Sequence, residues 1–373
     1  MGGVSVILPC LNEEKAIAGA IEQVLGVFKK NNIKGELIVV DNRSTDNSAK
    51  IAQKFDIKYV FEPRRGYGSA YLAGFKYARY DYLVLGDCDG TYDFNEIPAF
   101  LDFLKGHDLV IGNRFKGKIA KGAMSFSHQH FGNPILSAML RLFFKARLGD
   151  PHCGLRALTK KSLEKLNLRT TGMEFASEMI VKAINEKLKI KEIPIDYNRR
   201  MGTSKLNSLT DGWRHLRFML MYAPNYLFLI PGILISLIGL MIMILLLPGS
   251  FEVFGITLHN RPMVLGSFLT IVGYQIIILG IYAKAYIKTL GFKSDKVMDF
   301  IARIITFESG VMIGAVILLI SFAIAIYTAL DWIAKGFPEL TDNLMLFALT
   351  LAIIGVQTMF STFFLSILLV EKR

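Results

Sequence analysis

Four long apolar runs without charged residues fill the C-terminal part of the chain, and no other feature of the sequence restricts its fold as strongly. Each run holds at least ~20 residues, enough for a helix to cross a hydrocarbon core ~30 Å thick. Buried helices of a soluble protein are the alternative, but the length and the number of the runs favour membrane helices. The predicted spans are residues 226–247, 262–283, 309–330 and 344–370.

Basic residues between these runs predict how the spans are oriented. The loop between the second and third runs carries five lysines and arginines, whereas the two loops on the other side carry two between them. The positive-inside rule therefore places the middle loop and both termini in the cytosol. The net charge of +12 favours an anionic lipid bilayer as the partner of these basic residues. Nucleic acid is the rival partner of any basic chain, but we find no motif that reads it.

Short apolar segments alternate with helical segments in the part of the chain that precedes these runs. The predicted strands are Val4–Leu8, Glu36–Val40, Lys58–Phe61, Tyr82–Leu85, Leu109–Ile111 and Lys191–Tyr197. Such a β-α order is typical of a largely parallel sheet covered by helices on both faces. The predicted fold class is therefore an α/β domain with a Rossmann-like, mostly parallel sheet, followed by an all-α transmembrane domain of four helices.

Domain boundaries follow from the same change of pattern. We expect a cytosolic α/β domain at residues 1–205, an amphipathic interfacial helix and linker at 206–225, and the transmembrane domain at 226–373. Nothing at the N-terminus resembles a signal peptide, which agrees with a cytosolic first domain.

Three local predictions concern the loops between these elements. Asn12 is expected to cap a helix over about residues 13–30, and Ser44 or Thr45 to begin a helix that ends near Phe55. Residues 150–156 are expected to form a turn-rich loop.

Asp87 and Asp89 follow directly after the apolar strand Tyr82–Leu85. The strand delivers both carboxylates to the edge where open α/β sheets bind ligands. Alternate residues of an extended chain point to the same side, so both carboxylates are able to reach one point. Two hard oxygen ligands together with substrate phosphates suit Mg²⁺ or Mn²⁺. The alternative is a pair of solvated aspartates in a turn.

Two other stretches carry candidate binding residues. Asp41 ends a predicted strand, where its carboxylate could hold the base or the ribose of a nucleotide, although a turn or helix cap is the alternative. Residues 64–74 are rich in glycine and open a helix, whose N-terminal amides favour phosphate. This stretch is not a Walker A motif, because no Gly-Lys-Ser/Thr follows.

The three cysteines, Cys10, Cys88 and Cys153, are scattered along the chain and form no Cys-x-x-Cys pair. Neither a zinc site nor a disulfide framework is indicated by this spacing.

Several short motifs together carry a resemblance to a known family. They are Pro9, Asn12-Glu13, Val40-Asp41-Asn42, Arg65–Gly68 with Gly74, Asp87-x-Asp89, Asn113-Arg114, Cys153–Arg156 and Arg200-x-Gly-x-Ser-Lys205. Their order and spacing over roughly residues 3–220 resemble the family 2 glycosyltransferases. More narrowly, the chain resembles the dolichyl- or polyprenyl-phosphate hexose synthases.

The resemblance implies a GT-A fold, a nucleotide-sugar donor, a dolichyl or polyprenyl phosphate acceptor, a divalent metal and a single, inverting hexosyl transfer. Asp87 and Asp89 are then the metal motif, with Asp89 closer to the metal. The residues implied to bind the nucleotide are Pro9, Asn12, Glu13, Asp41, Gly66 and Gly68. Those implied to lie near donor or acceptor phosphates are Arg114, Arg200, Ser204 and Lys205. For Arg200 and Lys205, the alternative is a cluster that touches lipid headgroups.

The chain also departs from the pattern of its relatives. Thr91 stands where mannosyl synthases carry glutamine, so a UDP-sugar such as UDP-glucose is favoured over GDP-mannose. Histidines occupy a segment in which some relatives carry arginine, and they would bind phosphate only when protonated. The roles of His128, His130, Glu174 and Glu178 stay open, and the oligomeric state is unknown.

Two other functions compete with this interpretation. A processive polysaccharide synthase would usually carry a Gln-x-x-Arg-Trp motif, which the sequence lacks. A non-catalytic membrane module that binds nucleotide sugar or lipid would not need both Asp87 and Asp89.

Overall fold

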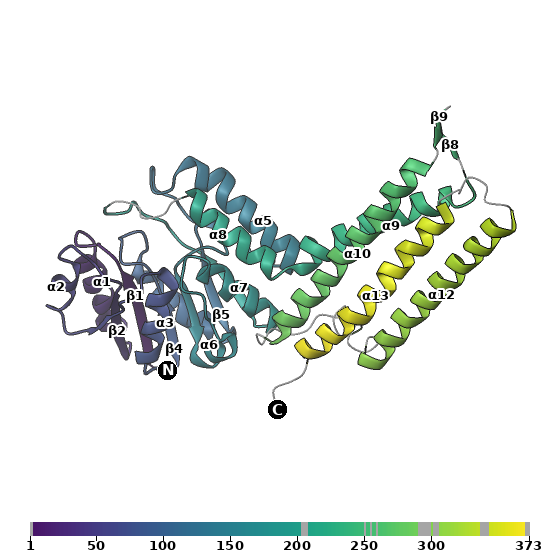
Figure 1. Cartoon of the computed structure of the whole chain (residues 1–373). Helices are drawn as coiled ribbons and strands as arrows, with labels where there is room; N and C mark the ends of the chain where they lie inside the picture. The colour runs from purple at the N-terminus through teal and green to yellow at the C-terminus, as the bar shows by residue number, and fades with distance from the viewer. Residues whose placement is uncertain are drawn as a thin grey trace. The chain divides into compact units, whose positions relative to one another are not determined.

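The computed structural model describes residues 3–202, 208–249, 251–253, 256–258, 260–289, 300, 306–335 and 343–369. Ser204 and Lys205, two of the predicted phosphate-binding residues, lie outside this part of the chain. The chain divides into two units, Met1–Met219 and Leu220–Arg373, which Figure 1 draws from purple to teal and from green to yellow.

One seven-stranded sheet organises the first unit, with the strand order β3-β2-β1-β4-β6-β5-β7. Its strands are β1 Val4–Cys10, β2 Gly35–Asp41, β3 Lys58–Phe61, β4 Tyr82–Leu85, β5 Leu109–Asn113, β6 Arg156–Thr159 and β7 Ile190–Pro194. Four neighbouring pairs are parallel, and β6 alone runs antiparallel to its neighbours β4 and β5. The prediction of a mostly parallel α/β sheet is therefore confirmed.

At least one helix follows each of these strands along the chain. These helices are α1 Ile17–Lys30, α2 Ser48–Ala52, α3 Tyr67–Tyr77, α4 Ile97–Leu104, α5 Asn133–Phe144, α6 Lys160–Leu166, α7 Phe175–Asn185 and α8 Ser208–Met221. Short 3-10 turns lie at Phe94–Glu96 and Arg114–Lys116, and a π-helical turn lies at His128–Gly132. The apolar stripe of α1, with buried side chains from Ile17 to Phe28 at helical spacing, packs into the core.

The predicted helix starts after β1 and β2 are wrong. α1 begins at Ile17 rather than near Glu13, and Asn12 does not cap it, because its Oδ1 accepts a hydrogen bond from the Thr45 amide at 2.7 Å. The second helix begins only at Ser48 and ends at Ala52. In return, Ser44 accepts a hydrogen bond from the Asn12 amide at 2.9 Å. The two loops satisfy each other's polar groups, which is why neither residue caps the helix that follows it.

The segment predicted as a loop at residues 150–156 leads into a strand that the sequence did not reveal. β6 holds only Arg156-Ala-Leu-Thr159, too short a run to show alternation, and it lies between β4 and β5. Its place in the sheet depends on partners that are far away in the sequence.

The second unit consists mainly of long apolar helices. They are α9 Ile230–Leu246, preceded by a π-helical turn at Asn225–Leu229, α10 Asn260–Thr289, α12 Phe307–Ala334 and α13 Asn343–Leu369. A small hairpin pairs β8 Phe251–Val253 with β9 Ile256–Leu258. Within the described residues, four helices are long and apolar enough to cross a membrane, and each coincides with one of the predicted runs.

Small and hydroxylated residues lie where these helices touch. A Cβ added at Gly314 of α12 would approach the carbonyl oxygen of Gly355 of α13 to 2.7 Å, so the two backbones are in close contact. Ser267 and Thr350 share a hydrogen bond of 2.7 Å between α10 and α13. Close backbone approach and hydrogen bonds between hydroxyl groups are typical of helix packing in membranes. Lipid tails are as apolar as the helix surfaces, so helices gain no hydrophobic stabilisation by packing against each other there.

Gly74 of α3 offers a test of how closely this helix lies on the sheet. A Cβ at this position would come within 2.5 Å of the Ile7 Cγ2 and 3.1 Å of the Val40 Cγ2. We expect Gly74→Val to lower the stability of the protein by about 1–3 kcal/mol through overpacking. The thermal unfolding midpoint of the full-length protein in detergent measures this.

The matched control is Gly26→Ala in α1, where an added Cβ meets no atom within 4 Å. It should leave stability unchanged or raise it by up to about 1 kcal/mol, because alanine favours the helix. Equal destabilisation by both substitutions would contradict the close packing of α3.

Candidate active site

A pocket of about 310 Å³ opens at the carboxyl ends of β1, β2 and β4. Its walls come from the loops after these strands, from the start of α3, from the segments around residues 172 and 200, and from α8. Six of the residues predicted from the sequence line it, namely Pro9, Glu13, Gly66, Asp87, Asp89 and Arg200. Asn12, Asp41 and Gly68 are chain neighbours of lining residues, whereas Arg114 lies in the wall of a different pocket.

The two aspartates of the predicted metal motif both face this pocket, with different partners. Asp87 accepts a hydrogen bond from the Tyr67 hydroxyl at 3.0 Å. Asp89 accepts hydrogen bonds from the Thr91 amide at 3.0 Å and the Thr91 hydroxyl at 2.6 Å. Burial and the neighbouring charge of Asp89 raise the pKa of Asp87 to about 7. The site thus holds two carboxylates whose mutual repulsion a cation would relieve.

Arg200 supplies positive charge to the same point. Its Nη1 lies 2.9 Å from the Asp89 Oδ2, and its Nη2 pairs with the Glu13 carboxylate. The segment that carries it is attached to the loop after β4, because the Met201 amide donates to the Asp89 carbonyl and the Asn198 amide donates to the Thr91 carbonyl, each at 2.9 Å. Arg200 therefore joins a predicted nucleotide-binding residue to a predicted metal ligand.

Asn42 shapes the start of α3, a role that the sequence motif alone did not reveal. Its Nδ2 donates to the carbonyl oxygens of Glu62 and Arg64, and its Oδ1 accepts from the Gly66 amide at 2.7 Å. Gly66 has a φ of +144°, and a Cβ there would collide with the Thr171 carbonyl oxygen. These contacts explain why glycine is needed here.

Two amides at the start of α3 already donate hydrogen bonds within the protein. The Gly68 amide donates to the Gly172 carbonyl at 3.3 Å, and the Ser69 amide donates to the Thr171 carbonyl at 3.1 Å. In this conformation the turn of α3 is bound to residues 171–172 rather than presenting those amides to a phosphate. The binding roles of Gly66 and Gly68 stay predictions.

Asp41 lies at the end of β2 with its carboxylate already bonded. Its Oδ1 accepts from the Ser44 amide at 3.1 Å, and its Oδ2 accepts from the Tyr59 hydroxyl at 3.2 Å. Burial and the Asp41 charge raise the pKa of Tyr59 to about 12, so the phenol stays a hydrogen-bond donor. The turn that was the alternative role of Asp41 is present, and its role in nucleotide binding stays a prediction.

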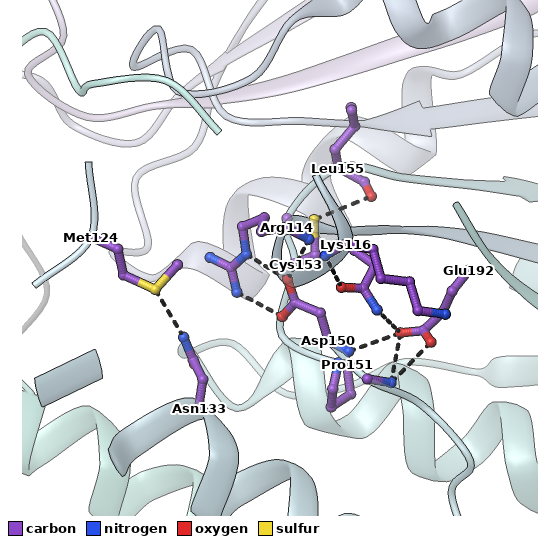
Figure 2. Close-up of polar contacts among 12 residues, drawn as sticks. Arg114, Lys116, Met124, Asn133, Asp150, Pro151, Cys153, Leu155 and Glu192 are labelled. Carbon is purple, nitrogen blue, oxygen red and sulfur yellow. Dashed lines mark hydrogen bonds and ion pairs between the residues drawn. The ribbon is translucent and has the colours of Figure 1, made fainter. Parts of the chain in front are cut away.

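Arg114 is held in a buried ion pair beside a second pocket of about 600 Å³. Its Nε and Nη2 donate to the two carboxylate oxygens of Asp150 at 2.7 and 2.8 Å. Figure 2 shows Asp150 between Arg114 and Glu192, which accepts the Asp150 amide at 2.8 Å. The guanidinium also lies over the Tyr197 ring, 5.2 Å from its centre. Its charge is thus balanced within the fold, and a contact with phosphate stays a prediction.

Glu174 and Glu178 have different hydrogen-bond partners. Glu178 is buried, lies 2.7 Å from the Lys182 amine, and accepts the amides of Arg169 and Thr170. It therefore holds the loop before α7, which is a structural role. The Oε1 of Glu174 accepts a hydrogen bond from the Gly172 amide at 3.2 Å, and its buried Oε2 has no hydrogen-bond partner among the residues that the structure describes.

The two histidines of the segment at residues 127–133 also lie in different surroundings. His128 lines the second pocket, together with Arg199 and Arg200. The ring of His130 instead lies 4.4 Å from the ring of Phe126. Of these two histidines, His128 is thus the one in a position to meet a ligand of that pocket.

A hydrogen bond fastens α8 to α7 beside the second pocket. The Ser177 hydroxyl lies 2.8 Å from the Nδ1 of His215 and 3.3 Å from the Nε2 of His152. Burial holds the pKa of His215 at about 4, below its ordinary value, so the imidazole is neutral in the fold. No local pattern predicts this contact, because the three residues are distant along the chain.

Because the His215 pKa is depressed in the folded state, its contribution to stability should be complete above pH ~6.5 and be lost as the pH falls toward 4. Near pH 4 the unfolded chain binds a proton at His215 more readily than the folded chain does, which lowers the free energy of unfolding by roughly 3 kcal/mol. Thermal midpoints measured from pH 7.5 to 4.5, compared between the wild type and His215→Gln, should show a shallower pH dependence in the variant. His107→Gln at the molecular surface should keep the wild-type dependence, and identical curves for all three proteins would contradict the assignment.

The buried Arg114–Asp150 pair predicts that removal of the Asp150 charge will lower the stability of the fold strongly. The Asp150 side chain is 1% exposed, so Asp150→Asn leaves a buried guanidinium without its counter-charge. Breaking a buried pair costs about 3 kcal/mol or more. That corresponds to a fall of about 6–12 °C in the thermal midpoint of a unit of this size.

Asp102→Asn is the matched control for this pair, because Asp102 pairs with Lys105 at the surface, where its side chain is 69% exposed. A surface pair contributes less than about 1 kcal/mol. Equal falls in the thermal midpoints of the two variants would show that the buried pair contributes no more to stability than the surface pair does.

Comparison with known proteins identifies the family. Residues 5–166 match the family described as glycosyl transferase family 2, and residues 281–369 match the glycosyltransferase family 2 C-terminal transmembrane region. The low-salt glycan biosynthesis hexosyltransferase Agl6 of Haloferax volcanii is 38% identical over 365 residues, which cover 97% of this chain and 88% of that protein. This chain belongs to glycosyltransferase family 2. It is therefore a glycosyltransferase with a membrane region, as its resemblance implied.

Other relatives agree with this family. A dolichyl-phosphate hexose transferase of Haloferax volcanii is 29% identical over 212 residues, covering 56% of this chain and 89% of that protein. The crystal structure of a mycobacterial protein superimposes with a TM-score of 0.50 at 21% identity, over 60% of this chain and 75% of that one. Together with the mostly parallel sheet, the family confirms the predicted GT-A domain followed by four apolar helices.

Proposed function

We propose that this glycosyltransferase moves a single hexose from a nucleotide sugar to dolichyl or polyprenyl phosphate, with inversion at the sugar carbon. The observation that carries the proposal is that Asp87, Asp89 and Arg200 meet in one pocket with the predicted nucleotide-binding residues Pro9 and Glu13. A relative named for dolichyl-phosphate hexose transfer supports the acceptor class. UDP-glucose is the favoured donor because of Thr91, and GDP-mannose is the second candidate.

The donor set of the pocket fits a divalent metal. Asp87 and Asp89 offer hard carboxylate oxygens in the pocket. Among the residues that the structure describes, there is no group of three or more His, Cys, Asp or Glu side chains that could hold a metal by itself. Two protein ligands with the remaining positions left to phosphate oxygens suit Mg²⁺ or Mn²⁺. When bound, such an ion supplies Lewis-acid stabilisation of the negative charge on a leaving diphosphate.

The chain's own residues account for the remaining requirements of the reaction. A lipid monophosphate is largely ionised near neutral pH, so it attacks without a general base and needs only to be positioned. Arg200, already paired with Asp89 and Glu13, is one of the two arginines among the described residues that line this pocket, and it could take a phosphate there. Ser204 and Lys205 belong to the same predicted motif and complete the proposal for the acceptor phosphate.

Orientation in the membrane is part of the same proposal. Basic residues of the loop after α10 support a cytosolic location of that loop, of the catalytic unit and of both termini. Residues 206–225 would then form the interfacial segment between the catalytic domain at 1–205 and the membrane domain at 226–373, where a lipid-borne phosphate arrives.

The test is transfer by the full-length protein to dolichyl phosphate in the presence of Mg²⁺ or Mn²⁺. Radiolabelled UDP-glucose, UDP-N-acetylglucosamine and GDP-mannose are offered separately, and the lipid fraction is extracted. We expect label from UDP-glucose in the lipid as a single sugar. Long polymer would favour a processive synthase, and donor binding without transfer would favour a binding module, so either result would overturn the proposal.

Asp89→Ala is the matched variant for this assay. It removes the carboxylate that faces the pocket while the fold retains the pairing of Arg200 with Glu13. We expect loss of transfer by at least ~100-fold, as for the removal of a group that stabilises charge in the transition state. Activity near the wild-type level in the folded variant would show that Asp89 holds no metal.

A further inference from the structure

Two of the three cysteines, scattered in the sequence, meet in the proposed donor pocket. Cys10 ends β1, and Cys88 lies between Asp87 and Asp89 beyond the end of β4. β1 and β4 are parallel neighbours whose register pairs Val4 with Tyr82 and Ile7 with Leu85. Beyond this register the Gly86 amide still donates to the Ile7 carbonyl at 3.4 Å, and Cys10 and Cys88 follow Ile7 and Leu85 three residues later along their own segments.

A hydrogen bond supports that placement. The Cys88 Sγ donates to the carbonyl oxygen of Pro9, the residue before Cys10, at 3.1 Å. Neighbouring strands lie about 4.8 Å apart, and a disulfide needs a Cα separation of about 4.4–6.8 Å. The spacing of neighbouring strands therefore falls within the range that a disulfide between Cys10 and Cys88 needs.

The surroundings of Cys10 set it apart from the third cysteine. Hydrogen bonds from Cys88 and from the Ser48 and Ser44 hydroxyls hold the pKa of Cys10 below its ordinary value, against its burial. Burial raises the pKa of Cys153 to about 12, and its sulfur lies near the Tyr92 hydroxyl and the Leu155 carbonyl rather than near a thiol. Cys10 is thus the more nucleophilic of these two sulfurs.

The pocket is also the route by which a reagent would reach these sulfurs. Cys10 and Cys88 are each only 1% exposed, yet both line the donor pocket. A small oxidant therefore enters where the nucleotide is proposed to bind, and a bound nucleotide would block its path.

We propose that Cys10 and Cys88 form a reversible disulfide inside the donor pocket, which makes this pocket a site of thiol modification by hydroperoxides. The Cys10 thiolate attacks the peroxide oxygen, which breaks the O–O bond and leaves a sulfenic acid and one water after proton uptake. The Cys88 sulfur then attacks the Cys10 sulfur and displaces a second water. Two thiols and one hydrogen peroxide thus become one disulfide and two waters.

The bond would lie between the two predicted metal ligands and next to Pro9. A link at Cys88 constrains the backbone on which Asp87 and Asp89 stand, so the oxidised protein should bind the donor less well. This consequence rests on the proposed function, whereas formation of the bond does not. The proposed cytosolic location agrees with a reversible bond, because disulfides of proteins in a reducing cytosol are typically transient and regulatory.

The test uses the purified full-length protein in detergent, treated with hydrogen peroxide and digested without reduction. Mass spectrometry is expected to find the peptides of Cys10 and Cys88 joined, with a loss of two hydrogens, while Cys153 remains a free thiol. Dithiothreitol should restore all three thiols. Cys153→Ala should give the same joined peptides, and Cys10→Ala and Cys88→Ala should give none.

Protection by UDP with Mg²⁺ separates this inference from the proposed function. With UDP at about ten times its dissociation constant, the rate of disulfide formation should fall about tenfold, because only the unoccupied fraction reacts. A disulfide that forms at the same rate with saturating UDP would support the thiol site and count against nucleotide binding in this pocket. Free thiols, sulfinic acids or bonds between molecules in place of the Cys10–Cys88 link would overturn the inference, even if UDP binds.

Discussion

The parallel alignment of β1 with β2 on one side and β4 on the other is the constraint on which the rest of the site depends. Cys10 pairs with Asp41 across one boundary, and Ile7 pairs with Leu85 across the other. The apolar residues of these strands are almost completely buried, so a shift by one residue would turn core side chains toward the wrong face. Burial of the core therefore determines where the polar residues after each strand emerge.

Charge balance is the second requirement that the fold meets. Glu13, Asp87 and Asp89 bring three carboxylates to one pocket, and partly buried charges need counter-charges. Arg200 arrives from the segment after β7 and is held there by backbone hydrogen bonds to the loop after β4. The part of the chain that leads toward the membrane region is thus built into the pocket rather than attached beside it.

Many of the conspicuous polar residues serve the architecture instead of a ligand. Asn42 holds the loop before α3, Asp150 neutralises Arg114, and Glu178 binds the amides before α7. Each satisfies buried groups that would otherwise be costly to leave unpaired. Asp150 and Glu178 do not line the donor pocket, whereas Asp87 and Asp89 do.

Periodicity, length and local spacing were enough to predict the α/β order, the four apolar helices, the family and the Asp87–Asp89 motif. The starts of α1 and α2, the strand β6 and the partners of Arg114 and His215 depend instead on contacts between distant segments. Asn12 bonds to Thr45 across two loops, and β6 needs neighbours on both sides, so no local pattern could reveal them. Cys10 and Cys88 illustrate the same limit. Their spacing along the chain indicates nothing, and only the pairing of two parallel strands brings the two residues to one pocket.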